Sequence, residues 1–223
     1  MRRWRHHIPR WANAVQAKSA PLAGCWGFLD GTFVQVQRPT SLQKEVYSGY
    51  YRGHGLKFLG VMAPNGLSPF VWGPASGRRH DSAVLTESGL LAQLSALHAA
   101  YPGIPYHLFG DSAFPLTANI QVGFKGAHLT QAQKDYNFAM SAVRIAVEWG
   151  FGRTANLWKF PAGSGPGQRQ IYKSASATQY LISALLTNCH ACAYGNVVSS
   201  YFGVPPPSLR AYLDVANPVP LAA

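Results

Sequence analysis

The feature that most constrains this chain is a long helical pattern between residues 131 and 160, QAQKDYNFAMSAVRIAVEWGFGRTANLWKF. At 3.6 residues per turn its apolar side chains form two stripes that together surround most of the helix. The first stripe contains Phe138, Ala142, Ile145 and Trp149, and the second contains Met140, Val143, Val147 and Phe151. We therefore expect a buried helix, interrupted only by a narrow polar stripe that includes Arg144 and Glu148.

Glu148 is the residue of interest in this helix. A buried glutamate costs several kcal/mol unless a cation or a hydrogen-bond partner compensates it. Two interpretations are open from the helix alone. Arg144 precedes Glu148 by four positions and is spaced for an ion pair, or Glu148 belongs to a site built with other acids.

The other acids favour a site. The chain has only eight: Asp30, Glu45, Asp81, Glu87, Asp111, Asp135, Glu148 and Asp214. Acids are normally spread over the surface, yet Asp30, Asp111 and Glu148 lie within or beside strongly apolar segments. Three carboxylates that converge cannot all stay ionised without cations between them. Hard oxygen ligands suit Mg²⁺ or Mn²⁺, and two such ions would support in-line displacement at a phosphodiester.

The pattern of strands predicts an α/β fold. Residues 25–39, which contain Asp30, read as a strand, and residues 56–63 and 70–73 read as two more, joined through Asn65-Gly66. These three predict an antiparallel meander. A short strand, residues 106–110, delivers Asp111 to its carboxyl end, where open α/β sheets hold their ligands.

Asp81 precedes an amphipathic pattern that runs from Val84 to Leu97. Together with Ser82 it is a natural N-cap residue, able to accept a backbone N–H bond. This structural role is the interpretation we favour from the residues alone.

The charge balance indicates a polyanionic partner. The chain has 19 Lys and Arg residues against 8 acids, a net charge of +11. This favours nucleic acid first and an anionic membrane surface second. The candidate DNA contacts are Lys44, Arg52, His54, Lys57, Arg78 and Arg79. Tyrosines interleave with the first four, so that this connection either stacks on bases or is a surface loop with tyrosines tucked beneath it.

The composition also indicates how the chain is divided. Residues 1–24, which carry no acid, are expected to form a poorly ordered basic arm or linker, and residues 25–160 the main domain. Residues 161–200 are expected to add a flexible break and a mostly apolar helix to that domain, and residues 201–223 to form a Pro-rich tail. No apolar run approaches the ~18 residues of a membrane span, so we expect a soluble, intracellular protein. Cys189 and Cys192 are spaced as half of a zinc site, but no second cysteine pair exists.

Four segments in order, GFLDGTFV, GRRHDSAVL, FGDSAFPL and LTQAQKDYNFAMSAVRIAVEWGFG, give the chain a specific resemblance. From about residue 24 to residue 160, and more weakly over LLTNCHAC, it resembles the nuclease domain of PIF/Harbinger-type DDE transposases and the nucleases derived from them. The resemblance implies a ribonuclease H-like fold, with a mixed five-stranded sheet flanked by helices. It also implies an Asp, Asp, Glu triad that binds two divalent metal ions, Mg²⁺ or Mn²⁺, and cuts DNA.

The triad carries over to three positions of this sequence. Asp30 in DGT matches the first acid, Asp111 in GDS the second, and Glu148, 37 positions further on, the third. Asp81 matches the family's HDS motif, where a supporting or structural role is expected. Arg144 is expected to hold the Glu148 carboxylate in position, with a phosphate contact as the alternative.

The sequence also departs from the family pattern. Phe33 and Phe114 replace a His and a Tyr found in many relatives, which affects the positioning of DNA rather than the triad. A helix-turn-helix domain commonly precedes the nuclease domain, and here about two dozen residues do. We expect a nuclear DNA endonuclease, cytoplasmic if it lacks an import signal or a partner. The alternative is a DNA- or protein-binding module whose catalysis has lapsed. A separate DNA-binding partner protein and a homo-oligomer are both left open.

Overall fold

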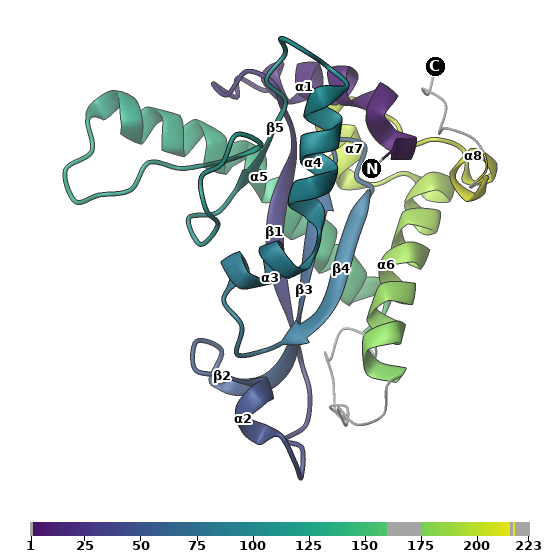
Figure 1. Ribbon diagram of the computed structural model, residues 1–223. Coiled ribbons are helices and arrows are strands. Elements are labelled where there is room, and N and C mark those ends of the chain that lie inside the picture. Colours follow the sequence, from purple (N-terminus) through teal and green to yellow (C-terminus); the bar gives the residue numbers. More distant parts are fainter. Residues whose placement is uncertain (1, 160–174, 215, 217–223) are drawn as a thin grey trace.

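The computed structural model describes residues 2–159, 175–214 and 216 (Figure 1). Its strands are β1 (Cys25–Gln35), β2 (Tyr47–Ser48), β3 (Gly53–Met62), β4 (Phe70–Ser76), β5 (His107–Gly110) and β6 (Ile120–Val122). Its helices are η1 (Arg2–His7), α1 (Ile8–Gln16), α2 (Gln43–Val46), α3 (Asp81–Glu87), α4 (Leu90–Ala99), α5 (Gln131–Leu157), α6 (Ala175–Tyr194), α7 (Val197–Phe202) and α8 (Leu209–Leu213).

The strands form one mixed sheet. Its main order is β4-β3-β1-β5-β6, and the two-residue β2 pairs with the start of β3. β3 is antiparallel to both β1 and β4, whereas β1, β5 and β6 run parallel. This order and these directions confirm the predicted meander and the mixed α/β sheet of a ribonuclease H-like fold.

Asn65 and Gly66 lie in the connection between β3 and β4, as predicted. Only Gly66 has a positive φ, +73°, while the Asn65 side chain accepts a hydrogen bond from the Leu67 backbone N–H at 3.2 Å. Asn196, far along the chain, donates to the Asn65 carbonyl at 3.0 Å, and a Cβ at Gly66 would lie only 1.8 Å from its Oδ1. The turn is therefore held by a distant segment as well as by its own residues.

Helices cover both faces of the sheet. α5 packs on one face against β1, β3 and β5, and α3 packs against β3 with α4 following it (Figure 1). α6 lies against β4 at the sheet's edge. The single amphipathic pattern expected over residues 84–97 is divided into α3 and α4 at Gly89, which has a φ of +68°.

The prediction that α5 is a buried helix, interrupted only by a narrow polar stripe, is only partly correct. Met140, Val143 and Val147 of the second stripe are buried against the sheet. The first stripe faces mostly outward, with Phe138 80% exposed, although its Trp149 is half-buried and packs against the core. The N-terminal part of α5 extends beyond the sheet (Figure 1), so only the C-terminal part is packed on it.

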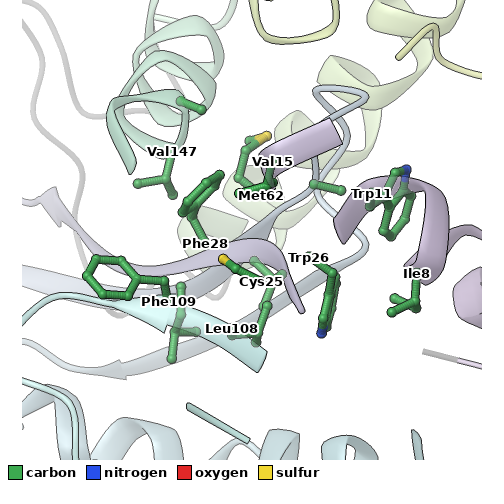
Figure 2. Close-up of a cluster of buried hydrophobic side chains, with 14 of the residues drawn as sticks. Ile8, Trp11, Val15, Cys25, Trp26, Phe28, Met62, Leu108, Phe109 and Val147 are labelled. Atoms are coloured by element: carbon green, nitrogen blue, oxygen red, sulfur yellow. The ribbon is translucent and has the colours of Figure 1, made fainter. Parts of the chain in front are cut away.

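The prediction that residues 1–24 are poorly ordered is wrong. η1 and α1 bury Trp4, Ile8, Trp11 and Val15, and the Trp11 and Trp26 rings stack with centroids 6.0 Å apart (Figure 2). These four side chains repeat at helical spacing, so one face of the basic segment is apolar. The segment completes the core at the start of β1.

The C-terminal segment is also packed as far as residue 214. α6 confirms the mostly apolar helix expected within residues 161–200, although part of its apolar surface is exposed. Tyr212 of α8 is buried and accepts a hydrogen bond from Asn188 at 3.0 Å. Arg3 donates hydrogen bonds to two backbone carbonyls of α8, those of Ala211 and Tyr212. The glycine-rich stretch at 162–170 lies outside the described residues. None of the described helices combines the length and apolarity needed to span a bilayer.

The burial of Trp11 predicts a large loss of stability on truncation. Trp11→Ala should lower the free energy of unfolding by about 3–5 kcal/mol, because it removes a fully buried ring and leaves a cavity. Trp11→Phe should cost less, since the indole N–H has no hydrogen-bond partner among the described residues. Urea denaturation gives both values. Phe138→Ala is the control, and a Trp11→Ala midpoint equal to that of the control would contradict the packing of α1.

Candidate active site

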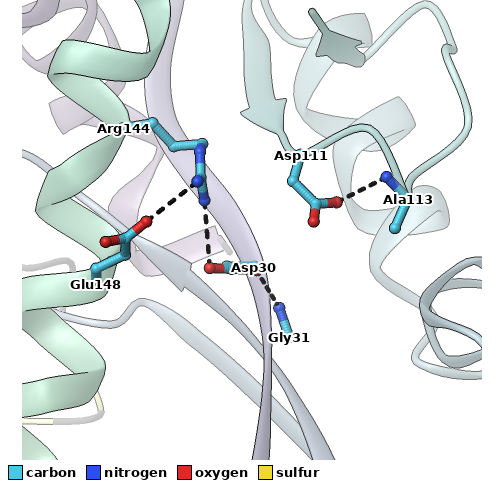
Figure 3. Close-up of polar contacts among 6 residues, drawn as sticks. All are labelled: Asp30, Gly31, Asp111, Ala113, Arg144 and Glu148. Carbon is cyan, nitrogen blue, oxygen red and sulfur yellow. Dashed lines mark hydrogen bonds and ion pairs between the residues drawn. The ribbon is translucent and has the colours of Figure 1, made fainter. Parts of the chain in front are cut away.

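The register between β1 and β5 places two acids side by side. Leu29 pairs with Gly110 in parallel register, so Asp30 and Asp111 occupy adjacent positions one residue further along. Side chains alternate along a strand, and Phe28 and Phe109 lie two residues before these acids. Asp30 therefore projects toward the face of the sheet that α5 covers, whereas the carboxylate of Asp111, just beyond β5, is turned toward the Ala113 backbone (Figure 3).

Asp30 is held in a desolvated position, with its side chain 21% exposed. Its carboxylate accepts a hydrogen bond from the Gly31 backbone N–H at 2.8 Å. Burial raises the pKa of Asp30 from 3.8 to about 6, against the lowering effects of the Gly31 bond and of the Arg144 charge. The negative charges of Asp111 and Asp81 raise this pKa further. Asp30 thus lies in a desolvated environment that favours the neutral form of its carboxyl group.

Arg144 bridges two of the predicted acids. Its guanidinium donates to Asp30 Oδ2 at 3.4 Å and to Glu148 Oε1 at 3.1 Å (Figure 3). The ion pair with Glu148 that the spacing allowed is therefore present. The same guanidinium also contacts the carboxylate of Asp30 on β1. Glu148 is 57% exposed, so the expectation of a buried glutamate is wrong. Glu148 is exposed because it lies at the border between the packed and outward faces of α5.

Local sequence explains how α5 reaches the sheet. Thr130 and Gln133 form a reciprocal capping box at its start. Gly150 lets the helix approach β3 closely, because a Cβ there would lie 1.9 Å from the end of the Met62 side chain. Arg144 and Glu148 occupy the two turns before this contact, which brings them over β1.

Asp111 lies just beyond β5. One carboxylate oxygen accepts from the Ala113 backbone N–H at 2.8 Å. Within the described residues, the other oxygen forms no hydrogen bond. Nearby, Lys125 donates to the carbonyl of Ser112, a cation that sequence reasoning missed because an isolated lysine in a loop gives no pattern.

Asp81 is not the N-cap residue that the sequence predicted. It is the first residue of α3, its neighbour His80 occupies the cap, and neither side chain caps the helix. Asp81 instead accepts from Lys57 Nζ at 2.8 Å, and a Cβ at Gly31 would lie 3.2 Å from its Oδ1. The acid therefore lies behind the strand that carries Asp30, a place that suits a supporting role.

The structure separates the six candidate DNA contacts into paired, cavity-lining and exposed side chains. Lys57 is paired with Asp81, and Arg79 is paired with Glu87 at 2.8 Å. Lys44, His54 and Arg78 come together around one cavity. Arg52 is exposed on the turn between β2 and β3 and has a φ of +49°.

Two carboxylates of this site have the chemistry of a divalent-cation site. Asp30 and Asp111 are adjacent, repel one another, and offer the hard oxygen donors that Mg²⁺ and Mn²⁺ prefer. No three His, Cys, Asp or Glu side chains in the described part of the chain are grouped closely enough to hold one metal ion, and this includes the region of Cys189 and Cys192. Glu148 is turned toward Arg144 and does not complete such a group.

The comparison with protein families agrees with this architecture. The family model of the DDE superfamily endonucleases matches residues 29–188. No curated protein and no solved structure gives a significant match. The matched region contains β1, β5 and α5 with Asp30, Asp111 and Glu148, and it covers most of the chain. The chain therefore belongs to the DDE superfamily endonuclease family.

Proposed function

We propose that this protein is a divalent-metal-dependent DNA endonuclease of transposase origin, of the PIF/Harbinger type, acting at Asp30, Asp111 and Glu148. Membership of the family supports nuclease activity and a DNA substrate. The observation that carries the proposal is the adjacency of Asp30 and Asp111 at neighbouring strands, facing a helix that supplies Glu148. A polyanionic substrate also suits a net charge of +11.

Asp30 and Asp111 would hold the cation, and Glu148 would join them once its carboxylate leaves Arg144. A bound Mg²⁺ or Mn²⁺ pair supplies charge stabilisation for the attacking and leaving oxygens of an in-line displacement. Asp30 must lose its proton before it can act as a ligand, and its raised pKa makes this step pH-dependent near pH 6. The Ala113 N–H fixes the orientation of Asp111, and the Gly31 N–H fixes that of Asp30.

Arg144 acts as a positioning residue in this proposal. Its guanidinium neutralises part of the charge on Asp30 and Glu148. A cation between the carboxylates would replace that neutralisation, and the guanidinium would then be available to a substrate phosphate. The two roles expected for Arg144 from sequence are therefore successive states of one side chain.

The alternative function is a DNA- or protein-binding module whose catalysis has lapsed. The contact between Arg144 and Glu148 favours it, because a permanent ion pair would keep Glu148 from the cation. In either case we propose a nuclear location, with a separate DNA-binding partner protein or a homo-oligomer to supply target selection.

Plasmid nicking with Mg²⁺ or Mn²⁺ tests the nuclease directly. Asp111→Asn and Glu148→Gln should each reduce the nicking rate by about 100-fold or more, because each removes a charged ligand from the reacting centre. Asp135→Asn is the matched control, since Asp135 is exposed on α5 and bonds only to Gln131 in the described structure. Equal rates in all four proteins would reject the assignment. Native protein that binds Mn²⁺ in calorimetry without nicking would support the lapsed module.

The raised pKa of Asp30 predicts a stability gain when its charge is removed. The folded carboxyl binds its proton near pH 6 and the unfolded one near pH 3.8, so the folded state holds more protons between these values. Ionising Asp30 therefore destabilises the fold as pH rises through this window. In EDTA, Asp30→Asn should be about 1–3 kcal/mol more stable than the native chain at pH 7.5 and equal to it at pH 4.

Urea denaturation at the two pH values measures this difference, with Asp135→Asn again as the control. Added Mn²⁺ should stabilise the native chain at pH 7.5 and leave Asp30→Asn unchanged, because the cation needs the ionised carboxylate. A destabilised Asp30→Asn at pH 7.5 would show instead that the ion pair with Arg144 outweighs desolvation.

A further inference from the structure

A cavity of about 630 Å³ lies beside the start of β3, apart from the candidate active site. It is formed where α2, β2, the start of β3 and the turn after β4 meet (Figure 1). The side chains that line it are those of Arg38, Gln43, Lys44, Tyr47, His54 and Arg78. Its size is within the range of small-molecule pockets.

The charge of the cavity is positive and uncompensated. Arg38, Lys44 and Arg78 contribute three cations, and no acid lines the cavity. None of the ion pairs in the described part of the chain involves these three residues, whereas Lys57 and Arg79 nearby are each paired with a carboxylate. Arg38 is also oriented, since its Nε donates to Gln43 Oε1 at 2.9 Å. Such a group of cations is suited to phosphate oxygens.

One wall of the cavity is aromatic. Tyr47 pairs directly with His54 across the β2–β3 ladder, and their rings make an edge contact with centroids 5.3 Å apart. Tyr47 is 43% exposed, so it keeps open surface although it is held by strand pairing. An aromatic ring fixed beside cations provides the two contacts that one nucleotide needs, stacking for the base and ion pairing for the phosphate.

The strand pairing sets the distance between the cavity and the candidate active site at Asp30. Asp30 pairs with Gly60 across the β1–β3 ladder, and His54 lies six residues before Gly60 on β3. At ~3.3 Å per residue this separation is roughly 20 Å. A DNA strand rises 3.4 Å per nucleotide, so the same length corresponds to about six nucleotides.

We propose that this cavity binds one unpaired nucleotide of the DNA substrate, about six nucleotides from the phosphodiester at Asp30 and Asp111. The base stacks on Tyr47, whose ring is held by the edge contact with His54, and Arg38, Lys44 and Arg78 bind its phosphates. The nucleotide is unpaired because the faces of a base inside a duplex are covered by its neighbours and cannot reach Tyr47. The choice of DNA rests on the proposed function, whereas the pocket itself does not require catalysis.

Binding of duplexes with and without one unpaired 2-aminopurine tests the proposal. The protein is Asp111→Asn in EDTA, so that cleavage cannot interfere, and the readouts are anisotropy and 2-aminopurine fluorescence. The duplex with the unpaired base should bind roughly 5- to 100-fold more tightly than the paired duplex. On binding, its 2-aminopurine fluorescence should be quenched by stacking.

Two substitutions in this background separate the base contact from the phosphate contact. Tyr47→Ala should abolish the preference for the unpaired base and the quenching, while Tyr194→Ala, on the exposed surface of α6, should not. Arg78→Gln should weaken both duplexes and reduce the salt slope by about 1, whereas Lys134→Gln on α5 should leave both unchanged. Thermal melts of the variants exclude unfolding as the cause.

The outcomes are distinguishable from a failure of the nuclease proposal. Equal affinity for the two duplexes, or equal effects of Tyr47→Ala and Tyr194→Ala, would overturn the pocket whatever the nicking assay shows. Tighter binding of an RNA duplex with the same unpaired base would overturn the choice of DNA. A preference for the unpaired DNA base in a chain that never nicks would support the pocket and reject the nuclease.

Discussion

The site depends on the placement of two carboxylates at the ends of adjacent parallel strand segments. The register of β1 and β5 places Asp30 beside Asp111, because the ladder pairs Leu29 with Gly110, one residue before each acid. Hydrophobic residues on either side, such as Phe28 and Phe109, are buried and prevent a slip of register. The free energy of the core is therefore what keeps the acids together. Burial is the largest cause of the raised pKa of Asp30 in this position, and the charges of Asp111 and Asp81 raise that pKa further.

α5 supplies the cation that partly neutralises the carboxylates of the site. It is capped by Thr130 and Gln133, and it approaches the sheet closely at Gly150. Between these points it carries Arg144 over the acids, where one guanidinium contacts carboxylates from β1 and from α5 itself. Helix and sheet are thus joined by apolar packing and by the same charges that form the candidate site.

Sequence patterns could predict the helices and strands of this fold better than the tertiary contacts that these elements make. The meander, β5 with Asp111 at its end, and the helical pattern of α5 all follow from local periodicity. The buried face of α5 could not be predicted, because two apolar stripes are present and only tertiary packing selects between Phe138 and Val143. The pairing of Asp81 with Lys57 was equally hidden, since the two residues lie 24 positions apart on different elements.

The prediction of a poorly ordered N-terminal arm was wrong for a different reason, and this reason changes how the charge of the chain is understood. The Arg-rich composition of residues 1–24 indicated an arm, yet Trp4 and Trp11 lie at helical spacing and are buried. Arg3 is occupied with carbonyls of α8 and residue 214, which makes it a structural residue. Lys57 and Arg79 are likewise held by acids. Net charge counts all of these equally, but a polyanion meets only cations that the fold has left unpaired. Such cations in the described structure include Arg38, Lys44 and Arg78, which gather around β2, so this surface is suited to a nucleic-acid contact.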